Sequence, residues 1–181
     1  MSAVTWKIDP AHTEVGFSVR HLMITTVKGR FGGVEGTVTQ VGDDPTTARV
    51  EARIQAASIH TGIDQRDAHL RSADFLDAER WPELRFTSRR VEKGSQGMRV
   101  HGDLTIRDVT RAIVLEVEPQ GTAQDPWGGV RAGYSVTGRI TRSDFGITWN
   151  QLIETGGVVV GDEVKLALEV QLVRQGLAAA A

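Results

Sequence analysis

Apolar and polar residues alternate with a period of two through most of this chain, and this pattern limits its fold more than any other feature. In the first clear run Val15, Phe17 and Val19 alternate with polar neighbours. Later runs have their apolar members at Val50, Ala52 and Ile54, at Val100, Gly102, Leu104 and Ile106, at Ile113, Leu115 and Val117, at Tyr134, Val136 and Ile140, and at Val164, Leu166, Leu168 and Val170. Such alternation is typical of half-buried strands, so the chain is predicted to be all-β.

Short turn sequences separate these runs: GDDPTT, EKGSQG, RDVTR and DPWGG. Strands joined by short turns favour an antiparallel sandwich or barrel over βαβ units. One segment, TGIDQRDAHLRSADFLDAERWPEL, breaks the alternation. Thr61 and Asp64 are candidate helix caps and Pro82 closes the segment, which predicts one or two short helices across an end of the barrel.

Four glycines and an arginine fall within VKGRFGGVEGTV, which is either a phosphate-binding loop or a bent strand. The stretch matches neither GxxxxGK[ST] nor GxGxxG, and more strand sequence follows it. Alternation also continues through the glycines. Glycine within a strand marks a bulge or a sharp bend, so a bent strand is favoured, and Arg30 carries the remaining case for an anion site.

Composition sets further bounds on the chain, which has 181 residues, a net charge of −2 and no cysteine. The length fits one domain over residues 1–181, with residues 175–181 expected to be a frayed tail. No basic face for nucleic acid is indicated, and no disulfide or thiolate chemistry is possible. The N-terminus lacks a secretory signal pattern and no apolar run approaches the roughly 18 residues of a membrane span, so a cytoplasmic location is expected.

No catalytic or metal motif stands out. GSQG falls short of a nucleophile elbow, and the histidines show no HExxH or HxH spacing. His60, Asp64 and His69 could assemble a metal site, but a solvated helix face is the favoured interpretation, so no metal and no cofactor are expected. In TRSDFGITW, Arg142 and Asp144 share a parity, which suggests a buried ion pair or a grip on the polar head of a ligand.

An eight-stranded barrel is just wide enough to be filled by its own side chains or to hold one small ligand. The sequence offers eight or nine strands. Bulky inward candidates include Phe17, Phe31, Phe86, Phe145 and Trp149. By residue type alone, a packed core is favoured over a ligand cavity.

Five stretches, in order, resemble one known family. They are WKIDPAHTEVGFSVRHLMITTVKGRFGGVEGT, SIHTGIDQRDAHLRSADFLDAERWPELRF, GDLTIRDVTRAIVLEVE, RSDFGI and VGDEVKLALEV. The chain is similar over nearly its whole length to the YceI-like family of lipocalin-like, polyisoprenoid-binding proteins. The resemblance implies an eight-stranded antiparallel lipocalin-like β-barrel with a short helical segment between the fourth and fifth strands.

The resemblance also implies a long apolar ligand inside the barrel: a polyisoprenoid, an isoprenoid quinone or a fatty amide. The implied partners are this lipid and a second copy of the chain, with no nucleic acid. The candidate ligand-binding residues are Phe17, Val19, Phe31, Ile54, Phe86, Leu104, Leu115, Val136, Arg142, Asp144, Phe145, Trp149 and Leu168.

The family pattern supplies no agreed catalytic residue, so the chain is expected to be an intracellular carrier or sequestering protein and not an enzyme. Many relatives are exported to the periplasm, and the lack of a signal pattern sets this chain apart from them. Two alternatives stay open. One is an enzyme acting on the bound lipid, with Arg142, Asp144, His21 or His69 as acid, base or anion clamp. The other is a filled barrel that acts through its outer surface.

Overall fold

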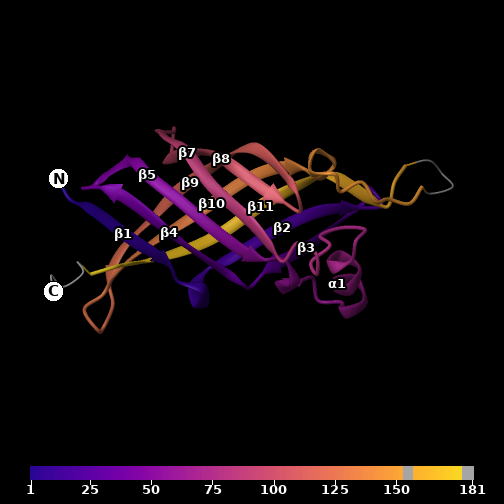
Figure 1. Cartoon of the computed structure of the whole chain (residues 1–181), viewed down its shortest axis with the longest axis horizontal. Helices are drawn as coiled ribbons and strands as arrows, with labels where there is room; N and C mark the ends of the chain where they lie inside the picture. Colours follow the sequence, from indigo (N-terminus) through magenta and orange to yellow (C-terminus); the bar gives the residue numbers. More distant parts are fainter. Residues whose placement is uncertain (153–156, 177–181) are drawn as a thin grey trace.

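The computed structural model describes residues 1–152 and 157–176. Eleven named strands form one antiparallel sheet that closes on itself (Figure 1). The strands are β1 (Ala3–Ile8), β2 (Glu14–His21), β3 (Thr25–Phe31), β4 (Val34–Val41), β5 (Asp44–Gln55), β6 (Ile59–His60), β7 (Glu83–Lys93), β8 (Met98–Ile106), β9 (Val109–Gln124), β10 (Val130–Thr141) and β11 (Val160–Arg174). The helical elements are α1 (Asp64–Arg71) and the 3₁₀ turns η1 (Pro10–His12), η2 (Ala56–Ser58) and η3 (Arg142–Phe145).

The closed ring runs β1-β4-β5-β7-β8-β9-β10-β11, and pairing of β1 with β11 completes it. Strands β2, β3 and β6 extend three of these strands past a bend. Along β11, for example, Ile8 of β1 pairs with Leu172, and after η1 Glu14 of β2 pairs with Glu169. β1 and β2 are therefore one bent strand, as are β3 with β4 and β5 with β6. The predicted eight-stranded antiparallel barrel is confirmed.

The glycine stretch lies at one of these bends. β3 ends at Phe31 and pairs with β2, whereas β4 begins at Val34 and pairs with β1. Gly32 and Gly33 carry the chain from one partner to the other, so the bent strand predicted here is confirmed.

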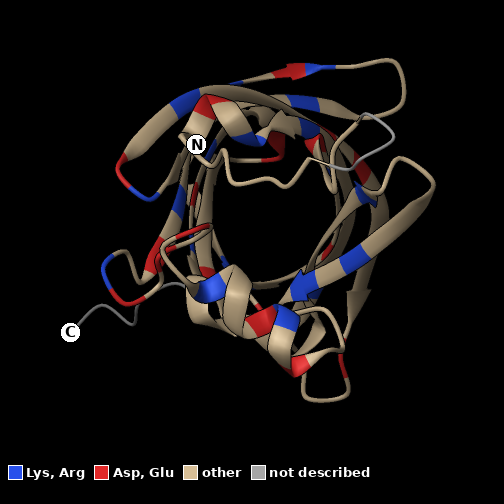
Figure 2. Cartoon of the chain, turned by 90° about the vertical axis from the view of Figure 1, so that its right-hand side faces the viewer, with Lys and Arg blue, Asp and Glu red and all other residues tan. Residues whose placement is uncertain are grey.

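The helix α1 lies across one end of the barrel, at the lower rim of the ring in Figure 2. It follows β6 and precedes β7. When each bent strand is counted once, α1 follows the third barrel strand, so its predicted place between the fourth and fifth strands is slightly off. The residue before the helix is Ile63, which offers no side-chain cap. Asp67 within the helix instead accepts hydrogen bonds from the backbone and hydroxyl of Thr61.

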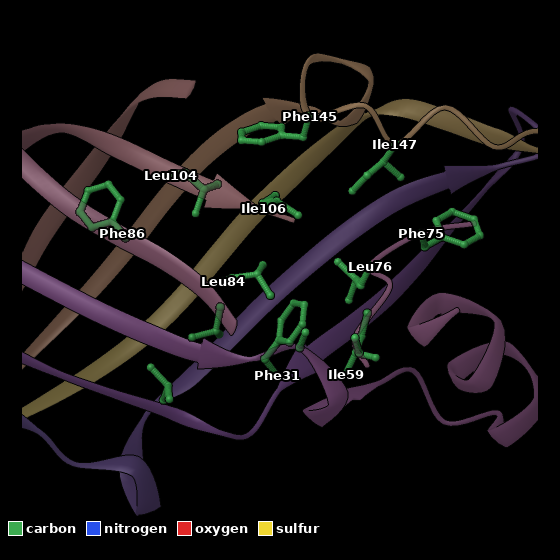
Figure 3. Close-up of a cluster of buried hydrophobic side chains, with 14 of the residues drawn as sticks. Phe31, Ile59, Phe75, Leu76, Leu84, Phe86, Leu104, Ile106, Phe145 and Ile147 are labelled. Carbon is green, nitrogen blue, oxygen red and sulfur yellow. The ribbon is translucent and has the colours of Figure 1, made fainter. Parts of the chain in front are cut away.

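Part of the barrel interior is a packed cluster of buried side chains (Figure 3). Phe31 and Ile59 contribute to it from β3 and β6, and Leu84 and Leu104 from β7 and β8. This cluster fixes the bent strands against the opposite wall. Among the described residues, no helix is long and apolar enough to cross a lipid bilayer. The predicted tail begins at Gln175, whose N–H donates to the carbonyl of Thr5, and residues 177–181 lie outside the described part.

Candidate functional site

Beside the packed cluster, the barrel encloses a cavity of about 510 Å³, here called the lumen. Side chains from all eight barrel strands, from α1 and from the segment after η3 line it. Within most strands every second residue contributes, because alternate side chains of a barrel strand point inward. The volume lies within the roughly 300–1,000 Å³ typical of small-molecule sites.

The structure places most of the predicted ligand-binding residues on the lumen wall. The wall includes Phe17, Val19, Phe31, Ile54, Phe86, Leu104, Leu115, Val136, Arg142, Trp149 and Leu168. For the members that lie within strands, parity in the sequence therefore predicted the direction correctly. That they contact a ligand stays a prediction.

Asp144 and Phe145 are not part of the lumen wall. β10 ends at Thr141, and η3 then turns the chain, with Gly146 ending it in the left-handed conformation at φ 74°. The alternation that predicted Asp144 to share a side with Arg142 therefore stops before either residue. Asp144 is exposed, Phe145 is only 1% exposed within the packed cluster, and no ion pair joins Arg142 to Asp144 among the described residues.

Arg142 is buried, with 6% of its surface exposed. Its Nε donates to the carbonyl of Gly161 at 2.8 Å and its Nη2 to that of Val160 at 3.2 Å. Its Nη1 donates to the carbonyls of Ile147 at 3.1 Å and Trp149 at 2.9 Å. Burial lowers the pKa of Arg142, and the negative charge of Asp162 partly opposes this. Four of the five guanidinium N–H groups are thus used by backbone carbonyls, which leaves little capacity to clamp a ligand anion.

The lumen wall is polar mainly at the end that carries α1. Arg20 and His21 of β2 and Arg66 and His69 of α1 contribute to it there. Arg66 is held by Thr61, whose hydroxyl accepts from Nε at 2.7 Å and whose carbonyl accepts from Nη2 at 2.8 Å. No Asp or Glu is among the described residues of the wall. The polar part of the lumen is therefore cationic or neutral.

Tyr134 of β10 also faces the lumen and was missing from the predicted site. Burial raises the pKa of its phenol. Its inward parity with Val136 was visible in the sequence, so the signal that places it was present. Arg66 gave no comparable signal, because its direction depends on how the short helix packs.

His60, Asp64 and His69 do not come together as a cluster. The Nδ1 atom of His60 lies 3.4 Å from a carboxylate oxygen of Asp67, whereas Nε2 of His69 is hydrogen-bonded to Asp74 at 2.8 Å. The His69 ring meets Phe75 and Trp149 edge-on, at centroid distances of 5.0 and 4.6 Å. In the part of the chain that the structure describes, no three histidine or acidic residues are grouped to hold a metal ion.

Comparison with known proteins gives consistent results. The model of the YceI-like domain matches residues 6–172. Protein YceI of Escherichia coli O157:H7 is 37% identical over 175 residues, which span 96% of this chain and 88% of that protein.

Two solved structures have the same fold. The crystal structure of the Campylobacter jejuni YCEI protein has a TM-score of 0.74 at 33% identity, covering 93% of this chain and 96% of that one. A polyisoprenoid-binding domain from Saccharophagus degradans has a TM-score of 0.67 at 15% identity, covering 92% of this chain and 97% of that one. The similarity to these proteins extends over almost the whole barrel, and the chain therefore belongs to the YceI-like domain family.

Proposed function

We propose that this protein binds one long-chain apolar lipid inside the lumen and acts as its carrier or sequestering protein. The ligand class is a polyisoprenoid, an isoprenoid quinone or a fatty amide. The observation that carries the proposal is the lumen itself, about 510 Å³ walled by aliphatic and aromatic side chains without a described carboxylate. The polyisoprenoid-binding domain with the same fold supports the choice of ligand class.

Apolar burial can supply the affinity with few hydrogen bonds. Removal of apolar surface from water contributes about 25 cal/mol per Å², so a long chain could bind tightly to such a wall. Arg20, His21, Arg66 and His69 are at one end of the lumen, where they could orient a polar head group. Because aliphatic walls discriminate weakly between ligands that differ by a methylene, selectivity among lipids of similar width should be loose.

The residues considered for catalysis are distributed in a way that favours binding. Arg142 is occupied by carbonyls, Asp144 is exposed away from the lumen, and His69 is bonded to Asp74. They do not form an acid–base pair around a common point. Lipid turnover is therefore not part of the proposal, and the dimeric state and cytoplasmic location stay predictions of the sequence.

Organic extraction followed by mass spectrometry tests the proposal directly. Protein made in a lipid-replete host and purified without detergent should release a non-covalent apolar lipid, because an unfilled apolar wall forfeits dispersion contacts. Native mass spectrometry of the same sample gives the stoichiometry and the oligomeric state. A lipid-free extract would contradict the proposal.

Leu168→Trp distinguishes a ligand site from a packed interior. Leu168 is on the lumen wall, paired with Val136 and Val15. If ligand occupies this space, the indole replaces part of it: delipidated protein keeps its melting temperature while lipid loading falls. If the space is filled by protein, overpacking costs roughly 1–3 kcal/mol and lowers the melting temperature by several degrees.

The matched control is Lys165→Trp, which places the same indole on β11 with the opposite parity. Lys165 is exposed, so this variant should change neither lipid loading nor stability. A destabilised Leu168→Trp protein that loads lipid normally would refute the assignment of Leu168 to the binding wall.

A further inference from the structure

The turn between β2 and β3 has an unusual sequence for its backbone. Residues 22–24 separate the two strands, and the N–H of Ile24 donates to the carbonyl of His21 at 3.1 Å to close a β-turn. Its central residues, Leu22 and Met23, have φ angles of 51° and 63°. Both positions favour Asn-Gly, because most side chains are strained at positive φ. Two bulky apolar residues at these positions are therefore not explained by the needs of the turn.

The same turn exposes its apolar side chains to solvent. Met23 is 59% exposed and Ile24 is 72% exposed. The neighbouring loop, joined to the turn by a 2.8 Å hydrogen bond from the N–H of Leu22 to the carbonyl of Val159, exposes Leu152. Exposed apolar residues that are scattered singly are ordinary, but adjacent ones on a projecting hairpin mark an interaction site.

The strands that carry this turn are basic. Together β2 and β3 contain Arg20, Lys28 and Arg30 and one acidic residue, Glu14, at the end of β2 away from the turn, although the whole chain has a net charge of −2. The guanidinium of Arg20 donates to the carbonyl of Met23 at 3.2 Å and to the hydroxyl of Thr26 at 3.1 Å. A positive charge is thereby held directly beside the exposed apolar pair.

Several carboxylates at this end of the barrel already have partners. Asp67 is bonded to Thr61, Asp74 to His69, and Asp162 to the hydroxyl of Ser143 at 2.7 Å. Among residues 1–152 and 157–176, no ion pair joins Arg20, Lys28 or Arg30 to an Asp or Glu.

The turn is also next to the lumen. Arg20 and His21, the two residues before it, contribute to the lumen wall. Figure 1 shows the hairpin reaching the right-hand end of the barrel, where α1 also lies, and Figure 2 views the ring from this end. A surface bound to the tip would therefore be close to the end of the lumen wall that carries Arg20 and His21.

We propose that the β2–β3 hairpin docks this end of the barrel on the surface of an anionic phospholipid bilayer. Met23 and Ile24 enter the boundary between head groups and acyl chains, Arg20 beside the tip faces the negative head groups, and Lys28 and Arg30, further along β3, add to the positive charge of the hairpin. An apolar tip flanked by basic residues is the composition of interfacial membrane anchors. One turn is too small for a stable protein–protein interface, which normally buries over about 1,000 Å². Docking would let an apolar lipid pass between the lumen and the bilayer without crossing water, and this consequence rests on the proposed function.

Vesicle co-sedimentation of the intact protein tests the docking. Wild type should bind vesicles that contain phosphatidylglycerol more strongly than vesicles of phosphatidylcholine alone, and added salt should weaken the difference. The double variant Met23→Gly with Ile24→Thr removes both apolar groups and relieves the positive φ at position 23. Its partition coefficient should fall by roughly tenfold. Its melting temperature should equal or exceed that of wild type, which shows that the fold is intact.

Trp127→Ser is the matched control. Trp127 is 84% exposed on the β9–β10 turn, which Figure 1 shows at the opposite end of the barrel, so this variant should bind as wild type does. The proposal is overturned if wild type does not bind, if the double variant binds equally well, or if only Trp127→Ser loses binding. Equal binding to both kinds of vesicle would overturn the electrostatic part.

Sedimentation equilibrium tests the alternative that the turn binds a second copy of the chain. A wild-type dimer that the double variant converts to monomer, without vesicle binding by either, would show that the turn is an interface between two copies and would overturn the proposal. Lipid extraction keeps the two proposals separate. Protein that yields lipid but ignores vesicles refutes docking alone, and protein that docks but yields no lipid refutes the lumen function alone.

Discussion

The side chain of Arg142 donates hydrogen bonds to four backbone carbonyls. Its guanidinium joins Ile147 and Trp149, after η3, to Val160 and Gly161 at the start of β11. Buried carbonyls that lose a charged donor must be desolvated without a partner. The residue therefore connects the turn after β10 to the strand that closes the barrel.

Arg142→Met should destabilise the protein by about 2–4 kcal/mol, because four hydrogen bonds to buried or part-buried carbonyls are lost. Arg139→Met is the control, since Arg139 is exposed and forms only a 3.6 Å ion pair with Glu163. An exposed pair of this kind contributes about 0–1 kcal/mol. Urea unfolding at neutral pH measures both. Equal midpoints for the two variants would contradict the structural role given to Arg142.

The sequence placed Arg142 at the site but assigned it the wrong partner. Parity predicts direction only while a strand continues, and here β10 ends one residue earlier. Local pattern also could not reveal the acceptors of Arg142, because two of them are on a strand 18 and 19 residues away. By contrast Phe17, Val136 and Leu168 lie within long strands, and for these residues alternation alone gave the correct side.

At the scale of elements, bends determine how this barrel closes. Along one edge, β1 and β2 both pair with β11. Along the other edge, β1 pairs with β4 and β2 pairs with β3, which are the two halves of the next bent strand. Glycine permits such bends where a side chain would collide with an adjacent strand. At Gly33, a Cβ atom would lie 2.8 Å from Cβ of Gln55, whereas at Gly32 it would meet nothing within 4 Å.

Gly33→Ala should therefore cost roughly 1–3 kcal/mol, because the new methyl group must displace the start of the Gln55 side chain. Gly32→Ala, one residue earlier, should be neutral or stabilising by about 0.4–1 kcal/mol, since it restricts the unfolded chain without a collision. Thermal and urea unfolding of the pair provide the comparison. The reverse order of stability would show that the bend is not limited by this contact.

Alternation and turn residues were enough to predict the strands and an antiparallel sandwich or barrel, and the resemblance to the YceI-like family implied the eight-stranded barrel. The bent strand at the glycines was predicted as well. The position of α1 in the strand order was not predicted, because the merging of β1 with β2 depends on pairing with β11, which is far away in the sequence: Ile8 pairs with Leu172 and Glu14 with Glu169. The pairing register of distant strands cannot be predicted from the local sequence pattern. That residues 1–181 form one domain stays a prediction.

For the molecule as a whole, one ion cluster joins two distant segments, the stretch from Asp9 to His12 and the β9–β10 hairpin. Arg131 at the start of β10 bonds to Asp9 at 2.7 Å and to Asp125 at 3.1 Å, and His12 bonds to Asp9 at 2.8 Å. The hydrogen bond from His12, reinforced by Arg131 and opposed by burial, lowers the pKa of Asp9. The backbone N–H of Gly129, with Arg131 and again against burial, lowers the pKa of Asp125.

A carboxyl group with a lowered pKa stabilises the fold at pH values above its unfolded pKa of about 3.9, and this contribution is lost as the pH falls through the folded value. The melting temperature should therefore decline between about pH 5 and about pH 2, and the decline should be smaller in Asp9→Asn. Asp43→Asn is the control, because the exposed Asp43 side chain makes no hydrogen bond to described residues. An unchanged pH profile in Asp9→Asn would rule out this contribution.

The closure of the ring has a consequence for how the chain is made. β11, the last strand, pairs with β10 along one edge and with β2 and then β1 along the other. During translation the N-terminal bent strand leaves the ribosome first and must keep an unpaired edge until nearly every other residue has been added. Non-local pairing of this kind slows folding, and unpaired edges attract other strands. Nascent chains should therefore complete the barrel only after β11 has left the ribosome, with the first strands as the segment most in need of a chaperone.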